Sequence, residues 1–294
     1  MLSAIAVFLN DALLPEAPVA LSNDGWFFTE MGRGCISHIP ALGEPRRTLA
    51  TTGRPNGLAV SADNTIWVAE SRHPALLRLL PGAAAEVLTA GYPDNPIRWP
   101  NDLCIGPDGM IYMTDSGVLL ADFEGVTPPE KAYKIPVDGK VLRIDPKNGD
   151  YVELDSGLQF ANGIAFGIGG EYLYISETLT GNIYRYRHQE GAASEREYFG
   201  NVMQQPPRSY GRVAGPDGMA FDADGNLYVA VLVEGTITVL KPDGTVNDRI
   251  HLPGHYPTNL AFSQTHPTQA VITEIQGNQL LHVDLTVPGL PLFS

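Results

Sequence analysis

The sequence PNDLCIGPDGMIYMTDS, residues 100–116, consists of two short apolar runs on either side of Gly-Pro-Asp-Gly. Apolar runs that flank an Asp-Gly turn predict a strand, a tight turn and a second strand. Five further segments follow this pattern, and their alignment predicts six copies of one unit. The other copies are PEAPVALSNDGWFFTEM (15–31), PNGLAVSADNTIWVAES (55–71), ANGIAFGIGGEYLYISET (161–178), PDGMAFDADGNLYVAVL (216–232) and PTNLAFSQTHPTQAVITEI (257–275).

The spacing of the copies indicates the architecture. Their aligned polar residues lie 40, 45, 61, 55 and 42 residues apart and are Glu16, Asn56, Asn101, Asn162, Asp217 and Asn259. A repeat of about 40–45 residues with four strands is typical of a propeller blade. We therefore predict an all-β, six-bladed β-propeller with four antiparallel strands per blade, forming a single domain over residues 1–294. The last repeat lacks a fourth strand, which the apolar run 4–9 is predicted to supply, closing the ring.

Two connections between predicted strands are longer than the others. Residues 117–138 lie between the second and third strands of the third repeat, and residues 201–215 precede the fifth repeat. Long connections in a compact domain usually act as lids or are disordered. The second connection should emerge at the same end of the propeller as the aligned polar residues.

The composition excludes several classes of partner. The 294 residues include 33 Asp and Glu against 19 Lys and Arg, a formal net charge of −14, which disfavours nucleic acid and anionic membranes. The apolar N-terminus has no basic residue before it and is too short to span a bilayer, so we expect a soluble, cytoplasmic protein. Cys35 and Cys104 are too few for a disulfide framework, and two reduced thiols are favoured over one bridge.

The six aligned residues are predicted to form a ring, because the first strand of each propeller blade lines the central channel. All six side chains carry oxygen, and Glu16 and Asp217 are anionic. Carboxylate and amide oxygens are the ligands of hard divalent cations, and the absence of His and Cys from the ring speaks against a dedicated zinc or copper site. Turn formation by the asparagines is the alternative. It stays open for Asn56 and Asn259 in particular, since a metal needs only three or four protein ligands.

The whole chain resembles the family of senescence marker protein (regucalcin), gluconolactonase and luciferin-regenerating enzyme. The most specific segments are Pro-Asn-Asp at 100–102, ANGIAF at 161–166 and GPDGMAFDADGNLYVA at 215–230. Members of this family are six-bladed propellers that bind one divalent metal ion and hydrolyse lactones. The resemblance implies that Glu16, Asn162 and Asp217 bind the metal, with Asn101 as a fourth ligand or as a contact to substrate or water. We expect the ion to be Ca²⁺, with Zn²⁺, Mn²⁺, Mg²⁺ and Fe²⁺ as alternatives.

Two departures from the family pattern concern the N-terminal motif and the substrate. Ala17 replaces the Gly that follows Glu16 in the family, and Trp99 stands where sugar-lactone members carry Arg. Loss of a guanidinium and gain of an indole favour a less polar lactone. The predicted substrate contacts are Trp99, Asn101, Tyr210 and His255. Packing of the aromatic residues and solvation of His255 stay open as alternatives.

The reaction implied by the resemblance is metal-assisted hydrolysis of a lactone. The cation would polarise the carbonyl, Asp217 would act as general base, and Asn101 would orient the substrate or the attacking water. Asp102 directly follows a ring residue on a pleated strand and is therefore expected to point away from the channel. Asp115 ends a second strand and has acidic equivalents in four other repeats, which predicts a structural role.

Two other classes of function stay open. One is a different metal-dependent activity at the same site, such as phosphotriester hydrolysis or non-hydrolytic lactone chemistry. The other is a non-enzymatic, metal-binding propeller. A scaffold alone has no reason to place two carboxylates in a channel, which favours an enzyme acting on a small molecule. The sequence does not indicate the oligomeric state.

Overall fold

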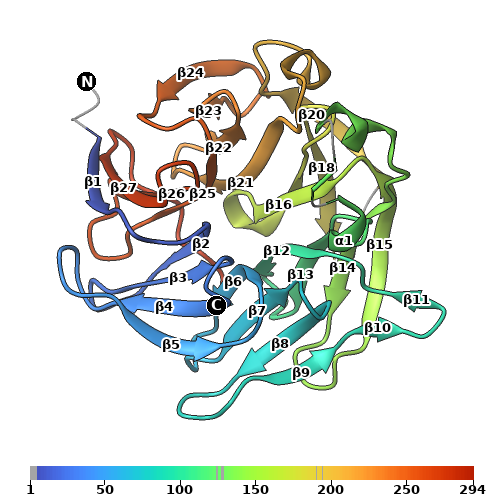
Figure 1. Cartoon of the computed structure of the whole chain (residues 1–294), viewed down its shortest axis with the longest axis horizontal. Coiled ribbons are helices and arrows are strands. Elements are labelled where there is room, and N and C mark those ends of the chain that lie inside the picture. The colour runs from blue at the N-terminus through green and yellow to red at the C-terminus, as the bar shows by residue number, and fades with distance from the viewer. Residues whose placement is uncertain (1–4, 124, 127–128, 190, 194) are drawn as a thin grey trace.

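The computed structural model describes residues 5–123, 125–126, 129–189, 191–193 and 195–294. Within these ranges the long strands form six antiparallel sheets, arranged around a central axis with the first strand of each sheet innermost (Figure 1). The predicted six-bladed β-propeller is confirmed. The blades are numbered 1 to 6 here in chain order.

Blades 1 to 3 are meanders of four strands. Blade 1 consists of β2 (Pro15–Ala20), β3 (Trp26–Glu30), β4 (Cys35–Ile39) and β5 (Arg47–Thr51). Blade 2 consists of β6 (Pro55–Val60), β7 (Ile66–Glu70), β8 (Ala75–Leu79) and β9 (Glu86–Thr89). A hairpin of β10 (Gly91–Tyr92) and β11 (Asn95–Pro96) follows. Blade 3 consists of β12 (Pro100–Ile105), β13 (Ile111–Asp115), β14 (Gly139–Ile144) and β15 (Tyr151–Leu158).

Blades 4 to 6 follow the same plan with small variations. Blade 4 consists of β16 (Ala161–Phe166), β17 (Tyr172–Glu177), β18 (Asn182–Gln189), β19 (Ala192–Ala193) and β20 (Glu197–Asn201). Blade 5 consists of β21 (Gly215–Phe221), β22 (Leu227–Leu232), β23 (Thr236–Leu240) and β24 (Val246–His251). Blade 6 consists of β25 (Pro257–Phe262), β26 (Gln269–Glu274), β27 (Gln279–Asp284) and β1 (Ala6–Leu9).

The N-terminal strand closes the ring, as predicted. β1 pairs antiparallel with β27, with Ala6 opposite His282 and Val7 opposite Leu281. Ala4, at the start of the predicted strand, lies outside the described residues. Pairing with β1 leaves no open edge on β27, which would otherwise present unpaired backbone groups to other chains.

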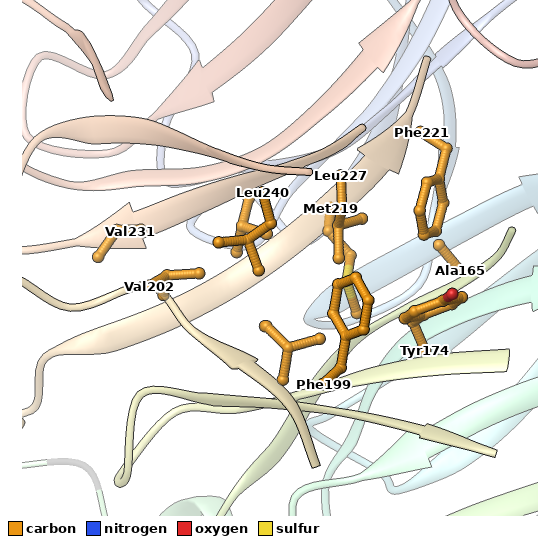
Figure 2. Close-up of a cluster of buried hydrophobic side chains, with 11 residues drawn as sticks. Ala165, Tyr174, Phe199, Val202, Met219, Phe221, Leu227, Val231 and Leu240 are labelled. Carbon is orange, nitrogen blue, oxygen red and sulfur yellow. The ribbon is translucent and has the colours of Figure 1, made fainter. Parts of the chain in front are cut away.

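The hydrophobic core lies between adjacent blades rather than at the axis. Figure 2 shows the cluster between blades 4 and 5, where Tyr174 and Phe199 face Met219, Phe221 and Leu240. The Tyr174 ring packs edge-on against Phe199 and Phe221, with centroids 5.0 and 4.8 Å away. Each strand in the middle of a blade is therefore covered on both faces, which explains its almost continuous apolar sequence.

The two ends of the channel differ. The segment after β27 runs past the far ends of β21 and β16, with Leu290 N–H donating to the Phe221 carbonyl at 2.9 Å and Phe293 packing on Phe166. The long connection in blade 3 lies at the other end, where the inner strands begin, and contains α1 (Leu120–Phe123) and η1 (Pro129–Lys134). We call this end the mouth.

The structure also settles the state of the two cysteines. Cys35 and Cys104 are both free thiols, so the bridge that was the alternative is absent. None of the helices in the described ranges is long and apolar enough to cross a bilayer.

Deleting residues 1–9 should lower the melting temperature by about 5–10 °C. The deletion removes β1 together with the apolar contacts of Ile5, Phe8 and Leu9, and it exposes the edge of β27. Calorimetry measures the melting temperature, and light scattering detects the self-association expected from an open edge. The control is Val7→Thr, which changes an exposed side chain but keeps the strand. A deletion variant as stable and as monodisperse as the control would contradict closure by β1.

Candidate functional site

The aligned polar residues lie at the mouth, near the start of the inner strands, and all are buried. In blade 6 the pairing corrects the predicted alignment. Pro257 pairs with Glu274 as Pro55 pairs with Glu70 in blade 2, which places Thr258 at the ring position. The prediction that Asn259 occupies the ring position is therefore wrong by one residue. The alignment by residue type selected Asn259 because the residue that directly follows Pro257 is a threonine and not Asn, Asp or Glu.

Every inner strand is irregular at this level. In blade 3, Pro100 pairs with Asp115 and Leu103 with Met113, so that Asn101 and Asp102 together lie opposite a single residue. The pairing shifts at the corresponding place in the other five blades. A β-bulge inserts one residue and interrupts the alternation of side chains between the two faces. Two consecutive residues of a strand can then both face the channel.

A hydrogen bond between opposite blades shows where Asp102 points. Asn259 Nδ2 donates to Asp102 Oδ2 at 3.3 Å, and both residues are only 7% exposed. Asn259 lies on β25 of blade 6 and Asp102 on β12 of blade 3, on opposite sides of the axis (Figure 1). The bond therefore crosses the channel. The expectation that Asp102 points away from the channel is wrong, because the bulge turns its side chain inward.

Glycines beside the ring allow the inner strands to approach one another. A Cβ on Gly218 would lie 2.0 Å from Cγ of Asn259, and a Cβ on Gly163 would lie 2.3 Å from the backbone oxygen of Asp217. Neither distance leaves room for a side chain. The Asn-Gly and Asp-Gly pairs at these positions thus lie inside strands and serve close packing between blades rather than a turn.

Three carboxyl groups gather at this level of the channel. Burial and the nearby charge of Asp102 raise the pKa of Glu16 to about 8, although the backbone N–H of Ala17 donates a hydrogen bond to its carboxylate at 2.8 Å. Burial raises the pKa of Asp102 to about 6. Burial, followed by the charges of Glu16 and Asp102, raises the pKa of Asp217 well above its usual value. Like charges in a desolvated site repel one another, so the three carboxyls together favour the binding of protons or of a cation.

Two ring asparagines have their amide nitrogens engaged. Asn101 Nδ2 donates to Ser116 Oγ at 2.9 Å, and Asn162 Nδ2 donates to Thr178 Oγ1 at 3.1 Å. The buried Oδ1 of Asn162 has no hydrogen-bond partner among the residues described. Buried polar atoms are rarely left unsatisfied in proteins. This oxygen is therefore free to bind a ligand.

The donor set fits a hard divalent cation. Glu16, Asn101, Asn162 and Asp217 offer carboxylate and amide oxygens, which are the ligands that such ions prefer. A positive charge would also reduce the repulsion between the carboxylates. Across the described ranges, no three or more His, Cys, Asp or Glu side chains are arranged to hold a metal ion. A cation at this place would therefore depend on the amide oxygens as well as on the two carboxylates.

The acidic residues at the ends of the second strands hold the loops of the mouth. Asp115 accepts hydrogen bonds from the backbone N–H groups of Arg98, Trp99 and Gly117 at 2.8, 2.9 and 2.9 Å. Glu274 in blade 6 accepts three backbone N–H groups in the same way. The predicted structural role of Asp115 is confirmed.

Trp99 is buried in an aromatic cluster instead of lining an open surface. It is 8% exposed and packs edge-on against Phe123 and Phe160, with ring centroids 5.7 and 5.3 Å away. Its indole Nε1 is buried and has no hydrogen-bond partner in the described part of the chain. Packing thus accounts for the ring of Trp99 but not for its N–H group.

The other two predicted substrate contacts lie on separate loops. The Tyr210 hydroxyl donates to Glu234 Oε1 at 2.6 Å, and burial and this neighbour raise the pKa of Tyr210 to about 12. His255 is exposed, and its backbone N–H donates to Gln276. Trp99 lies just before β12, which carries Asn101, whereas Tyr210 and His255 are held by their own neighbours.

Asp102 was missed as a channel residue, although the sequence contains a signal for it. The residue after the ring position is Ala17, Gly57, Gly163 or Gly218 in four blades. Only Asp102 and Asn259 break this pattern of small residues. These two exceptions are the pair that bonds across the channel. Ala17 adopts a φ of 41°, in the region that favours glycine, which agrees with glycine at this place in the family pattern.

Replacing Asn259 by leucine, whose side chain has the same number of non-hydrogen atoms, should lower the free energy of unfolding by about 1–3 kcal/mol. The substitution removes the donor to Asp102 and leaves buried carboxyls with fewer hydrogen bonds. Urea-induced unfolding followed by circular dichroism measures the change. The matched control is Asn247→Leu on the exposed part of β24, which should alter stability by less than about 0.5 kcal/mol. Equal losses in the two variants would show that the bond across the channel contributes nothing.

The chain has relatives of known sequence and structure. A gluconolactonase of Zymomonas mobilis is 28% identical over 218 residues, which cover 72% of this chain and 59% of that protein. The match thus spans less than two thirds of the length of this relative.

Two solved structures share the fold. A gluconolactonase of Xanthomonas campestris matches with a TM-score of 0.76 and 23% identity, covering 96% of this chain and 89% of that one. A calcium-binding regucalcin of Agrobacterium tumefaciens matches with a TM-score of 0.79 and 17% identity, covering 98% and 96%. Residues 14–276 match the SMP-30/Gluconolactonase/LRE-like region, and the chain therefore belongs to this family.

Proposed function

We propose that the chain is a divalent-cation-dependent lactonase that opens a cyclic ester at the mouth of the channel. The observation that carries this proposal is the buried group of Glu16, Asn162 and Asp217. It combines an amide oxygen that lacks a partner among the described residues with two buried carboxyls, and burial and neighbouring carboxyls raise the pKa of both. The name of the Zymomonas relative, gluconolactonase, supports a lactone as the substrate.

Glu16, Asn162 and Asp217 would hold the cation, with Asn101 as a fourth ligand or as a contact to substrate or water. A bound divalent cation polarises an ester carbonyl and stabilises the negative charge that develops on its oxygen. Oxygen ligands of this kind favour Ca²⁺, and Mg²⁺ and Mn²⁺ prefer similar donors.

Asp217 is the proposed general base. Because burial raises its pKa, its ionised form has a high affinity for the proton of the attacking water. The water oxygen bonds to the carbonyl carbon, the ring C–O bond breaks, and the proton passes from Asp217 to the departing alkoxide. Asn101 is held by Ser116, so its amide oxygen is placed to orient that water. The product is an open-chain hydroxy acid.

The role of Trp99 as a substrate contact is proposed for its N–H group alone. Trp99 lies two residues before Asn101 along the chain. Its ring packs against Phe123 and Phe160 and supports the wall of the mouth. Only the buried Nε1 remains to donate a hydrogen bond to a substrate oxygen. Tyr210 and His255 are proposed as outer contacts on the flanking loops.

Asp217→Asn should lower kcat for lactone hydrolysis by about 100-fold or more while the protein stays folded. The amide cannot accept the proton of the attacking water. Hydrolysis of glucono-1,5-lactone and other lactones, followed with a pH indicator in calcium and in chelator, measures the effect. The matched control is Asp248→Asn on the exposed part of β24, which should keep the wild-type rate.

The same assay separates the alternatives. Undiminished hydrolysis by Asp217→Asn would remove this residue from the mechanism. Cation-dependent turnover of phosphotriesters but not of lactones would favour a different activity at this site. A bound cation without turnover of lactones, aryl esters or phosphotriesters would favour a non-enzymatic propeller.

Removing divalent cations should make the stability of the protein fall as the pH rises. A folded-state pKa of about 8 for Glu16, against an ordinary 4.5, means that its contribution is full below pH 4.5 and is lost as the pH rises to 8. Between pH 5 and pH 9 the free energy of unfolding in chelator should fall by roughly a few kcal/mol, as measured by urea unfolding.

Glu16→Gln is the matched variant, and its stability should depend less on pH because it lacks the titrating carboxyl. Excess calcium should reduce the pH dependence of the wild-type protein, since a cation stabilises the ionised carboxyls. The same slope in calcium and in chelator would count against a cation at Glu16.

A further inference from the structure

Two arginines stand at the mouth on the loop 202–214, which connects β20 to β21 and so leads directly to Asp217. The guanidinium of Arg208 lies over the ring of Tyr133, 5.5 Å from its centroid. The guanidinium of Arg212 donates to the hydroxyl of Tyr256. Tyr133 belongs to the long connection of blade 3, and Tyr256 directly precedes β25 of blade 6. Both arginines thus lie at the rim of the channel, between blades 3, 5 and 6.

The loop that carries these arginines is fixed to the connection of blade 3. The Tyr133 hydroxyl donates to the Arg212 carbonyl at 3.3 Å and accepts the Ala214 N–H at 3.4 Å. Val213 packs against the same apolar cluster as Trp99. The two long connections identified in the sequence therefore meet over the mouth. Their contact holds the backbone of the loop and sets where the guanidinium groups lie.

Neither arginine forms an ion pair with a carboxylate within the described residues. Glu234, which contacts this loop, is already engaged by the backbone N–H of Gln204 at 2.8 Å and by the hydroxyl of Tyr210 at 2.6 Å. Elsewhere in the molecule, arginines such as Arg143 and Arg196 are paired with aspartates at 2.8 and 2.7 Å. In a chain with a net charge of −14, two arginines held by aromatic residues instead of acids are distinctive.

We propose that Arg208 and Arg212 bind an anionic substituent of the substrate, such as a carboxylate, sulfonate or phosphate group. The inference rests on the proposed lactonase function and specifies its substrate class as lactones that carry such a group away from the ring carbonyl. It replaces the expectation of a less polar lactone, which rested on Trp99 alone. Planar guanidinium groups donate two parallel hydrogen bonds to oxyanions of this kind. The buried carboxyls of the channel repel the substituent, which therefore lies at the rim while the ring reaches Asp217.

The first test compares a neutral lactone with its charged analogues. The probes are glucono-1,5-lactone and derivatives that carry a carboxylate, a sulfonate or a phosphate on the exocyclic carbon. We expect kcat/KM to be about tenfold or more higher for at least one charged lactone, and this preference should shrink in high salt. The three charged probes distinguish which oxyanion fits the rim.

The double variant Arg208→Gln/Arg212→Gln should reduce the ratio of kcat/KM for the charged over the neutral lactone by about tenfold or more. The matched control is Arg47→Gln on the exposed outer strand β5, which removes a positive charge far from the mouth and should keep the wild-type ratio. A ratio near one in the wild-type protein, or a ratio that the double variant preserves, would overturn the inference.

A binding measurement keeps this test independent of turnover. Calorimetry with the lactam analogues, in which a ring N–H replaces the ester oxygen, reports affinity without hydrolysis. Tighter binding of the charged lactams that is lost in the double variant, without turnover of any lactone, would sustain the arginine site and overturn the proposed hydrolysis. Turnover of the neutral lactone without any preference for charged lactones would sustain the proposed hydrolysis and overturn the arginine site. Equal binding of neutral and charged lactams would overturn the arginine site in either case.

Discussion

The close approach of the inner strands determines the geometry of the channel. Neighbouring strands lie so near one another that Gly163 and Gly218 have no room for a side chain. A bulge at the same level turns two consecutive residues of a strand toward the axis. The channel is consequently narrow enough for Asn259 to bond with Asp102 across it, so that side chains from all parts of the chain meet in one small volume.

This arrangement places charge where it is unfavourable. Removing a carboxylate from water costs several kcal/mol unless it is paired, and the raised pKa values of Glu16 and Asp217 express that cost as affinity for protons. With apolar side chains at these positions, the propeller would fold without this desolvation cost. Unfavourable groups that persist in a well-packed structure are typical of functional sites, where a ligand offsets the cost. The proposed cation would do so here.

Local sequence was sufficient to predict the blades but not the detail of the channel. A strand and its turn depend on a few neighbouring residues. The six related segments PEAPVA, PNGLAV, PNDLCI, ANGIAF, PDGMAF and PTNLAF therefore predict six inner strands correctly. The bulge was not predicted, since it changes no residue type and only shifts the pairing by one. The hydrogen bond between Asp102 and Asn259 could not be predicted from the sequence for another reason. It joins residues 157 positions apart that meet only once the ring has closed.

The rim of the mouth carries arginines and its interior carries carboxyl groups, and this asymmetry would orient a substrate before any specific contact forms. Glu16, Asp102 and Asp217 make the interior acidic, whereas Arg208 and Arg212 stand at the rim with no carboxylate paired to them in the described chain. A molecule with an anionic group at one end and an ester carbonyl at the other would enter carbonyl first, because the reverse orientation drives its charge toward three carboxyls. Such steering needs no lid to move. It requires only that the two long connections hold the arginines in place, which the contacts of Tyr133 accomplish.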